Sequence, residues 1–286
     1  MLLITGATGQ LGQAVLAQLL RRTAASQLAA FVRDEAKAAP LREAGVSLRL
    51  GDYDNRPALD RAMQGVEKVL LIAGTDEERR VQQHAAVIDA AQRAGVRCLA
   101  YTSRTLRDPT TLSNQLMLGH FQTEDYLRAS GLPHLIFRNV LYMDTLPRFV
   151  GTALETGVVA LPAGRGRVPF ALRAEQGEAI ANALLDAPCD NRTYELTGQQ
   201  AYSFADVAAA LTAMAGRPVR YDDVAPAAFA AQLVARGLPE LVVRRSAGFL
   251  ADIKNNQEST VSPELAALLG RAPTTLEAGL RKLYQQ

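Results

Sequence analysis

The chain has 286 residues, of which 48% are hydrophobic and 21% charged, so it can bury a substantial core. Its formal net charge of +2 gives no reason to expect nucleic acid as a partner, and no apolar run approaches the roughly 20 residues that membrane insertion requires. Cys98 and Cys189 lie far apart, and neither they nor the three histidines have metal-ligand spacing, so we expect no disulfide framework and no metal site. Because a predicted strand opens the chain and leaves no room for a signal peptide, we expect a cytoplasmic protein.

The first half of the chain alternates short apolar runs with helical patterns. The apolar runs predict six strands, at residues 2–5, 28–33, 46–50, 69–72, 98–103 and 135–138. The intervening segments predict helices, at about 11–22, 34–43, 57–64, 78–94 and 120–130. Continuous apolar runs are typical of parallel strands that are buried on both faces. This order predicts an α/β fold, a doubly wound parallel Rossmann sheet.

The rhythm changes after Asn139. Residues 157–170 are rich in glycine and proline, 193–196 predict one more strand, and 204–215 predict an amphipathic helix before an alanine-rich, helical remainder. We therefore predict a Rossmann domain over residues 1–145, which a returning segment near 172–197 joins. A small C-terminal α/β lobe, formed by residues 146–171 and 198–286, is predicted to bind the substrate.

A glycine-rich turn joins the first predicted strand to the first predicted helix. Its GxxGxxG spacing is that of the relatives of short-chain dehydrogenases, and its residues are Gly6, Ala7, Thr8, Gly9, Gln10, Leu11 and Gly12. Glycine lets a diphosphate approach the backbone, and the helix N-terminus supplies free N–H groups and partial positive charge. The turn predicts a dinucleotide site; the alternative is a glycine-rich turn without a ligand.

The end of the second predicted strand distinguishes NADP from NAD. The position where an acidic residue would bind the ribose hydroxyls of NAD holds Arg33, and Lys37 follows one turn later. A guanidinium can bind a 2′-phosphate through two hydrogen bonds, so we predict NADP(H). Asp34 could partly neutralise this charge, and Arg33 could instead merely cap a surface strand.

Ligands of such folds bind outside the carboxyl ends of the strands. The residues that follow the third, fourth and fifth predicted strands are therefore further candidates for cofactor binding: Asp52, Tyr53, Ala73, Gly74, Thr75, Thr102 and Ser103. Asp52 could accept a hydrogen bond from the adenine amino group and Tyr53 could flank the adenine ring. The alternative for Asp52 is a cap of the following helix.

Five motifs resemble, in their order, the NmrA-like atypical short-chain dehydrogenases. They are the glycine turn, Arg33, Gly51-Asp52-Tyr53, Ala100-Tyr101-Thr102-Ser103 and Arg138-Asn139-Val140-Leu141-Tyr142. The likeness is strongest to the members that reduce quinones and triphenylmethane dyes. It implies NADP(H) as cofactor, a small aromatic acceptor as partner and a monomer or homodimer.

The resemblance also assigns residues to the nicotinamide and the acceptor. It places Arg138, Asn139 and Val140 along the nicotinamide, with Asn139 and Tyr142 facing the acceptor and Phe170 lining the same site. The alternative for Tyr142 is a packing residue between the two domains.

The sequence names no certain catalytic side chain. The Tyr-x-x-x-Lys pair of ordinary short-chain dehydrogenases is absent from residues 118–124. Quinones need less assistance than carbonyls, so we predict hydride transfer from NADPH to quinone-like or related aromatic acceptors. His120 and Tyr142 are candidate proton donors, although His120 could equally be a packing group, and His84 fits a core histidine.

The missing pair also favours a function of another class. Some NmrA-like proteins sense redox state by binding NADP(H) without turning it over, and this chain could be such a regulator. A third alternative, an isoflavone-reductase-like enzyme, would need a lysine near Gly119 that the sequence lacks.

Overall fold

The computed structural model describes residues 1–76 and 78–285, which divide into two compact units. The first unit consists of Met1–Arg104, Leu116–Asn139 and Arg173–Glu195, and the second of the remaining segments. The first unit thus includes the returning segment, whereas residues 105–115, which we expected in the Rossmann domain, lie in the second. Gln286, the end of the expected lobe, lies outside the described residues.

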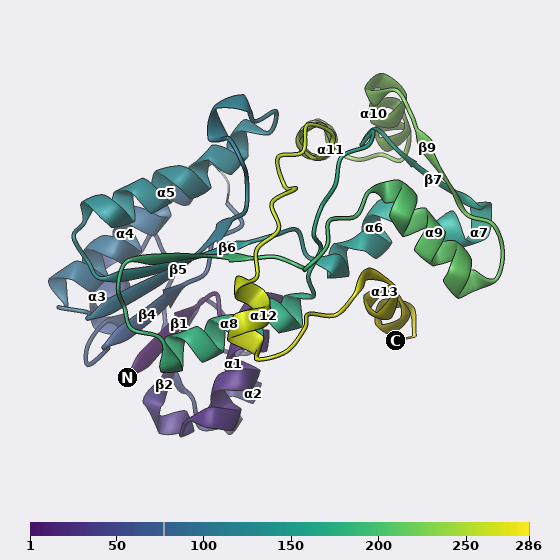
Figure 1. Ribbon diagram of the computed structural model, residues 1–286. Helices are drawn as coiled ribbons and strands as arrows, with labels where there is room; N and C mark the ends of the chain where they lie inside the picture. The colour runs from purple at the N-terminus through teal and green to yellow at the C-terminus, as the bar shows by residue number, and fades with distance from the viewer. Residues whose placement is uncertain (77, 286) are drawn as a thin grey trace. The chain divides into compact units, whose positions relative to one another are not determined.

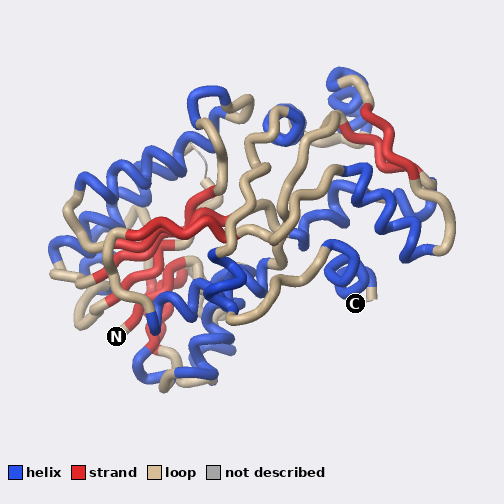
Figure 2. Tube along the Cα trace, viewed as in Figure 1, coloured by secondary structure: helices blue, strands red, loops and turns tan. Residues whose placement is uncertain are grey.

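A seven-stranded sheet with the order β3-β2-β1-β4-β5-β6-β8 forms the centre of the first unit, and the pairings from β3 to β6 are parallel (Figure 1, Figure 2). Its strands are β1 (Leu2–Thr5), β2 (Leu28–Val32), β3 (Ser47–Leu50), β4 (Lys68–Leu71), β5 (Cys98–Arg104), β6 (His134–Asn139) and β8 (Arg192–Leu196). Its helices are α1 (Gln10–Arg22), α2 (Ala39–Glu43), α3 (Arg56–Ala62), α4 (Arg80–Arg93), α5 (Leu118–Ala129) and α8 (Arg173–Asp186). The predicted doubly wound Rossmann fold is confirmed.

Helices cover both faces of this sheet (Figure 1). On one face, under α3, α4 and α5, the register aligns Leu3, Val69 and Leu99 in a row across three strands, and all three are fully buried. On the other face α1 packs closely against α8. The helices are so close that a Cβ atom at Gly177 would lie 2.6 Å from Ala14 Cβ. The apolar runs of the sequence therefore form strands because both of their faces are covered.

One predicted helix is shorter in the structure than in the prediction. We expected a helix over residues 34–43, but residues 34–38 form turns and α2 begins at Ala39. The Asp34 carboxylate accepts the backbone N–H of Lys37 at 3.1 Å, which closes a local turn that competes with the helix. Pro40 then suits the first turn of α2.

The expectation about the cysteines is wrong. Cys98 and Cys189 form a disulfide, with their Cα atoms 5.9 Å apart. Cys98 begins β5 and Cys189 precedes β8, so both lie where strands begin, at the amino edge of the sheet. Their separation of 91 residues hides this proximity, because only the path of the crossovers brings the two segments together.

The second unit holds a two-stranded parallel sheet and several helices. Its strands are β7 (Val158–Leu161) and β9 (Arg220–Asp223), and neither was predicted. Its helices are α6 (Leu146–Val150), α7 (Ala153–Thr156), α9 (Phe204–Ala215), α10 (Pro226–Ala235), α11 (Glu240–Lys254), α12 (Glu264–Leu269) and α13 (Leu276–Tyr284). Short 3₁₀ helices complete the chain: η1 (Ala25–Gln27), η2 (Pro109–Thr111), η3 (Gln115–Met117) and η4 (Met143–Thr145). Among the described residues, no helix combines the length and apolar character that a bilayer crossing needs.

Candidate cofactor site at the carboxyl edge of the sheet

The strand order places a topological switch point between β1 and β4. From β1 the chain proceeds to β2 on one side, and it later returns to β4 on the other. The turn that follows β1 and the segment that follows β4 therefore flank the same crevice at the carboxyl edge. This is the position where doubly wound sheets bind their ligands.

In the glycine turn, the backbone rather than side chains borders this crevice. Gly9 donates its N–H to Gly6 O at 3.0 Å, and Gly6 has a left-handed φ of 60°. A Cβ at Gly12 would lie 2.4 Å from Gly6 O, so only glycine fits there. In the described part of the chain no side chain caps α1, and its first turn holds no acidic residue, which leaves the helix N-terminus open to an anion.

Arg33 directly follows β2 and its side chain is exposed. Within residues 1–76 and 78–285, no hydrogen bond or ion pair of its guanidinium is found, although its charge acts on Tyr53. Asp34, the possible neutralising group, lies 3.7 Å from Lys37 Nζ instead. The two predicted phosphate ligands thus differ: Lys37 already has a carboxylate partner, whereas Arg33 has none among the described residues.

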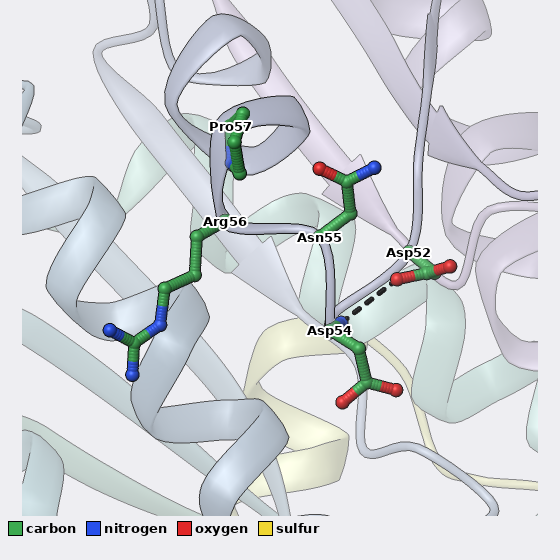
Figure 3. A pocket seen from close by; sticks show the side chains of 5 residues that line it. All are labelled: Asp52, Asp54, Asn55, Arg56 and Pro57. Carbon is green, nitrogen blue, oxygen red and sulfur yellow. Dashed lines mark hydrogen bonds between the residues drawn. The ribbon is translucent and has the colours of Figure 1, made fainter.

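Asp52 closes a turn at the end of β3. Its Oδ1 accepts the N–H of Asp54 at 2.9 Å, and the N-terminus of α3 is capped by Asn55, so the helix-cap alternative for Asp52 does not hold. A hollow of about 560 Å³ lies here and is lined by Asp52, Asp54, Asn55, Arg56 and Pro57. Figure 3 shows that the Arg56 side chain points away from Asp52, which leaves the Asp52 carboxylate without a cationic neighbour among the side chains drawn.

Tyr53 turns its hydroxyl inward. The hydroxyl lies 2.6 Å from Thr5 Oγ1 and 3.1 Å from the carbonyl oxygen of Ile72, so it ties the ends of β1, β3 and β4 together. Burial raises the pKa of Tyr53 to about 12, although the Thr5 hydrogen bond and the Arg33 charge oppose that rise. The hydroxyl is therefore neutral and structural, and only the ring is left to flank a ligand.

Side chains from other elements hold the segment after β4. The N–H of Ile72 donates to Thr5 Oγ1 at 3.0 Å and that of Ala73 to Thr102 Oγ1 at 2.9 Å. Gly74 N–H donates to His84 Nε2 at 3.1 Å. The backbone amides of Ala73 and Gly74, two of the predicted cofactor-binding residues, therefore already have partners. Thr75 is exposed.

Ser103 and Arg138 belong to a buried ionic cluster. Ser103 Oγ donates to Glu124 Oε1 at 2.5 Å, and Arg138 donates to both oxygens of the same carboxylate, at 2.9 and 2.7 Å. Arg138 also pairs with Glu195 at 3.0 Å. These two predicted cofactor ligands thus hold β5, β6, β8 and α5 together. Sequence reasoning missed Glu124, because a lone glutamate on a helix normally indicates a solvated face.

Asn139, at the end of β6, carries a buried side-chain amide oxygen that has no partner among the described residues. The residue is 2% exposed, and its Oδ1 has no hydrogen-bond partner among the described residues. An unpartnered buried amide costs free energy, so it is more often completed by a ligand or a water than left alone. Asn139 remains a candidate for contact with the cofactor or the acceptor.

Three further predicted residues, one along the nicotinamide and two at the acceptor, belong to the second unit. Val140 is fully buried, and its N–H donates to Leu196 O at 3.3 Å. Tyr142 is half-buried and forms a backbone bridge with Ala171. Phe170 is 1% exposed, with its ring packed edge-on against Phe204 at 6.3 Å. Phe170 therefore forms part of the core of its own unit.

His120 does not have the properties of a cationic proton donor. It is buried and its Nδ1 lies 3.0 Å from the hydroxyl of Tyr101. Burial, then the charges of Arg80 and Arg104, hold the pKa of His120 well below 6.5. An imidazole that is neutral at pH 7 supports the packing alternative for His120 better than the expected role as a proton donor.

Comparison with known proteins agrees with this geometry over almost the whole chain. The model of the NmrA-like family matches residues 1–279. Quinone oxidoreductase 2 of Escherichia coli is 37% identical over 284 residues, which are 99% of each chain. The NAD(P)H azoreductase of Xenophilus azovorans is 30% identical and covers 96% of this chain and 92% of its own.

Solved structures show the same likeness. The crystal structure of the E. coli NADPH-dependent quinone oxidoreductase in complex with NADPH superimposes with a TM-score of 0.94, over 99% of this chain and 100% of that one. The triphenylmethane reductase of Citrobacter sp., complexed with NADP(H), is 33% identical, with a TM-score of 0.92 over the same shares of the two chains.

Proposed function

The chain belongs to the NmrA-like family, and we propose that it is an NADPH-dependent reductase that transfers hydride to quinone-like or related aromatic acceptors. The observation that carries the proposal is the glycine turn, in which a side chain at Gly12 would clash with Gly6 O, together with the Arg33 guanidinium, which has no partner among the described residues. The relatives support it, because quinone, azo-dye and triphenylmethane reductases all match nearly the full chain.

The residues of the first unit fit NADP(H). The open N-terminus of α1 and the amides of the glycine turn would hold the diphosphate, and Arg33 would hold the 2′-phosphate. The Asp52 carboxylate would accept a hydrogen bond from the adenine amino group. The Asn139 amide oxygen, which is unpartnered among the described residues, suits the polar nicotinamide end. When bound, the nicotinamide supplies the hydride.

The acceptor needs little chemical assistance from the protein. A quinone accepts hydride readily, and water can protonate the product, so positioning supplies most of the rate enhancement. His120 is buried and neutral, which leaves Tyr142 as the candidate donor. We propose a small aromatic acceptor, a monomer or homodimer and a cytoplasmic location.

A non-catalytic redox sensor is the second candidate. The absence of Tyr-x-x-x-Lys over residues 118–124 and the neutral His120 favour it, since both leave the chain poor in proton donors.

One assay separates the two candidates. Purified protein is given NADPH or NADH with benzoquinones, naphthoquinones and triphenylmethane dyes, and oxidation is followed at the nicotinamide absorbance. A reductase oxidises NADPH faster than NADH and only when an acceptor is present. Binding of NADPH by calorimetry without turnover of any acceptor would establish the sensor, and no binding at all would remove both candidates.

A further inference from the structure

His84 connects the crevice to the interior of the first unit. It lies on α4 and is fully buried, yet its Nε2 accepts the N–H of Gly74, in the segment that follows β4. Its Nδ1 lies 3.0 Å from the hydroxyl oxygen of Thr123 on α5. One imidazole thus links a loop at the switch point with two helices.

The hydrogen bonds define the tautomer of this ring. A backbone N–H can only donate, so Nε2 of His84 must be the unprotonated nitrogen. A neutral imidazole then carries its proton on Nδ1, which donates to Thr123 Oγ1. The hydroxyl of Thr123 lies 2.7 Å from the carbonyl oxygen of Gly119, to which it can donate in turn. The three hydrogen bonds therefore all point the same way: each group donates to the next, from Gly74 N–H to Gly119 O.

The surroundings keep the ring in place and uncharged. Tyr101, in β5, packs edge-on against His84 with ring centroids 5.3 Å apart, and Tyr53, which follows β3, does so at 6.3 Å. Burial, then the charge of Arg80, lowers the pKa of His84 to about 3. The ring is therefore a permanent hydrogen-bond acceptor for Gly74 at physiological pH.

We propose that the His84–Thr123 pair is a positioning device, which fixes the Gly74 peptide in the orientation that the bound pyridine nucleotide requires. The inference rests on the proposed function, because it assigns the loop after β4 to the nucleotide site. Neither side chain reaches the crevice as a ligand; both act through the loop. A loop held in its bound conformation loses less entropy on binding, so the pair increases affinity for the nucleotide without contacting it.

Four variants test the pair. His84→Phe keeps an aromatic ring between Tyr53 and Tyr101 but removes the acceptor, and His84→Gln restores an acceptor oxygen. Thr123→Val removes the acceptor for Nδ1–H with nearly unchanged shape. His134→Phe is the matched control, because His134 is another buried histidine of the same unit and lies at the start of β6, at the amino edge.

The measurements are the Kd for NADPH, the KM for a naphthoquinone at saturating NADPH, and amide exchange at Gly74 in the free protein. We expect His84→Phe and Thr123→Val to raise the NADPH Kd about tenfold, the size of one lost hydrogen bond. Gly74 should exchange faster in both, and the quinone KM should stay unchanged. His84→Gln should recover most of the affinity, and His134→Phe should bind as the wild type does.

The proposal is overturned if the folded His84→Phe and Thr123→Val proteins bind NADPH normally, or if His84→Gln binds no better than His84→Phe. Equal loss in His134→Phe would also overturn it, because general destabilisation would then explain the effect. Failure of the wild type to bind NADPH overturns the proposed function and this role together. A protected Gly74 amide in that protein would still show that the hydrogen bonds exist.

Discussion

Arg138 donates two hydrogen bonds to the Glu124 carboxylate, from Nε to one oxygen at 2.9 Å and from a terminal nitrogen to the other at 2.7 Å. The Glu124 side chain is fully buried, whereas that of Arg138 is 23% exposed. Arg128 donates to the same carboxylate at 2.8 Å. The cluster joins α5 to β6, directly beneath the carboxyl edge of the sheet where the cofactor site is proposed.

Replacing Glu124 with glutamine should destabilise the first unit, because it removes the buried negative charge that accepts two hydrogen bonds from Arg138 and leaves Glu195 to balance that guanidinium. We expect a loss of about 3 kcal/mol in the free energy of unfolding, at the low end for a buried pair because Arg138 keeps some contact with water. Denaturant unfolding measures it. Asp125→Asn is the control: this neighbouring carboxylate is exposed and pairs with Arg128 at 3.1 Å, so it should cost less than about 1 kcal/mol. Equal losses would refute the special role of Glu124.

The same cluster predicts a dependence of stability on pH. Burial alone would raise the pKa of Glu124, but hydrogen bonds from Arg138, Ser103 and Arg128 outweigh it, so the pKa is lowered from 4.5. The stabilisation is therefore complete above pH 4.5 and is lost as the pH falls through the lower folded-state value. Unfolding midpoints measured from pH 7 downward should decline below pH 4.5, and less steeply in Glu124→Gln. Parallel declines would show that other carboxylates dominate.

Arg33→Ala should weaken binding of NADPH and spare NADH. Loss of charge-assisted hydrogen bonds to a 2′-phosphate corresponds to about 1.5–3 kcal/mol, or roughly 10- to 100-fold in Kd. Arg42→Ala is the control, because Arg42 is an exposed arginine nearby whose charge already pairs with Glu35 at 2.7 Å. Calorimetric titration with both nucleotides decides it, and comparable losses for NADPH and NADH would defeat the assignment.

Gly12→Ala should abolish tight binding of either nucleotide. The new Cβ would lie 2.4 Å from Gly6 O, so the turn must move away from its present path. We expect Kd to rise by more than about tenfold, with a stability loss of about 1–3 kcal/mol from the clash. Gly248→Ala, where the nearest atom would be 3.4 Å away, is the matched glycine control and should bind normally. Normal binding by Gly12→Ala would place the diphosphate elsewhere.

Reduction of the Cys98–Cys189 disulfide should lower stability but leave turnover unchanged. A bond that closes a 91-residue loop stabilises by up to about 4–5 kcal/mol in the chain-entropy model. It lies at the amino edge, away from the proposed site. Thermal unfolding and quinone reduction are compared for the oxidised protein and Cys189→Ser. A fall in activity at temperatures where the variant is folded would contradict this separation.

The disulfide also bears on location. Thiols are kept reduced in most cytoplasms, so our cytoplasmic expectation and the observed bond oppose one another. Alkylation of free thiols in intact cells before lysis measures the reduced fraction. A fully oxidised protein in cells would overturn the cytoplasmic location.

Local patterns in the sequence were enough to predict much of the candidate site. Apolar runs predicted the strands that form the core, and the GxxGxxG spacing predicted the turn, because each depends on neighbours in sequence. The α9 helix has the predicted bounds, 204–215, since Ser203 and Asp206 form a capping box that is visible in the sequence. Arg33 could be singled out for the same reason, as the residue that directly follows β2.

Which polar groups stay open to a ligand was decided only by tertiary structure. The amides of Ala73 and Gly74 are taken by Thr102 and His84, and the charge of Arg138 by Glu124, through contacts between segments distant in sequence. The same holds for the pairing of Cys98 with Cys189. A sequence shows which side chains can donate or accept, but a hydrogen bond needs two groups about 3 Å apart, and only the packed crossovers of the sheet determine those distances.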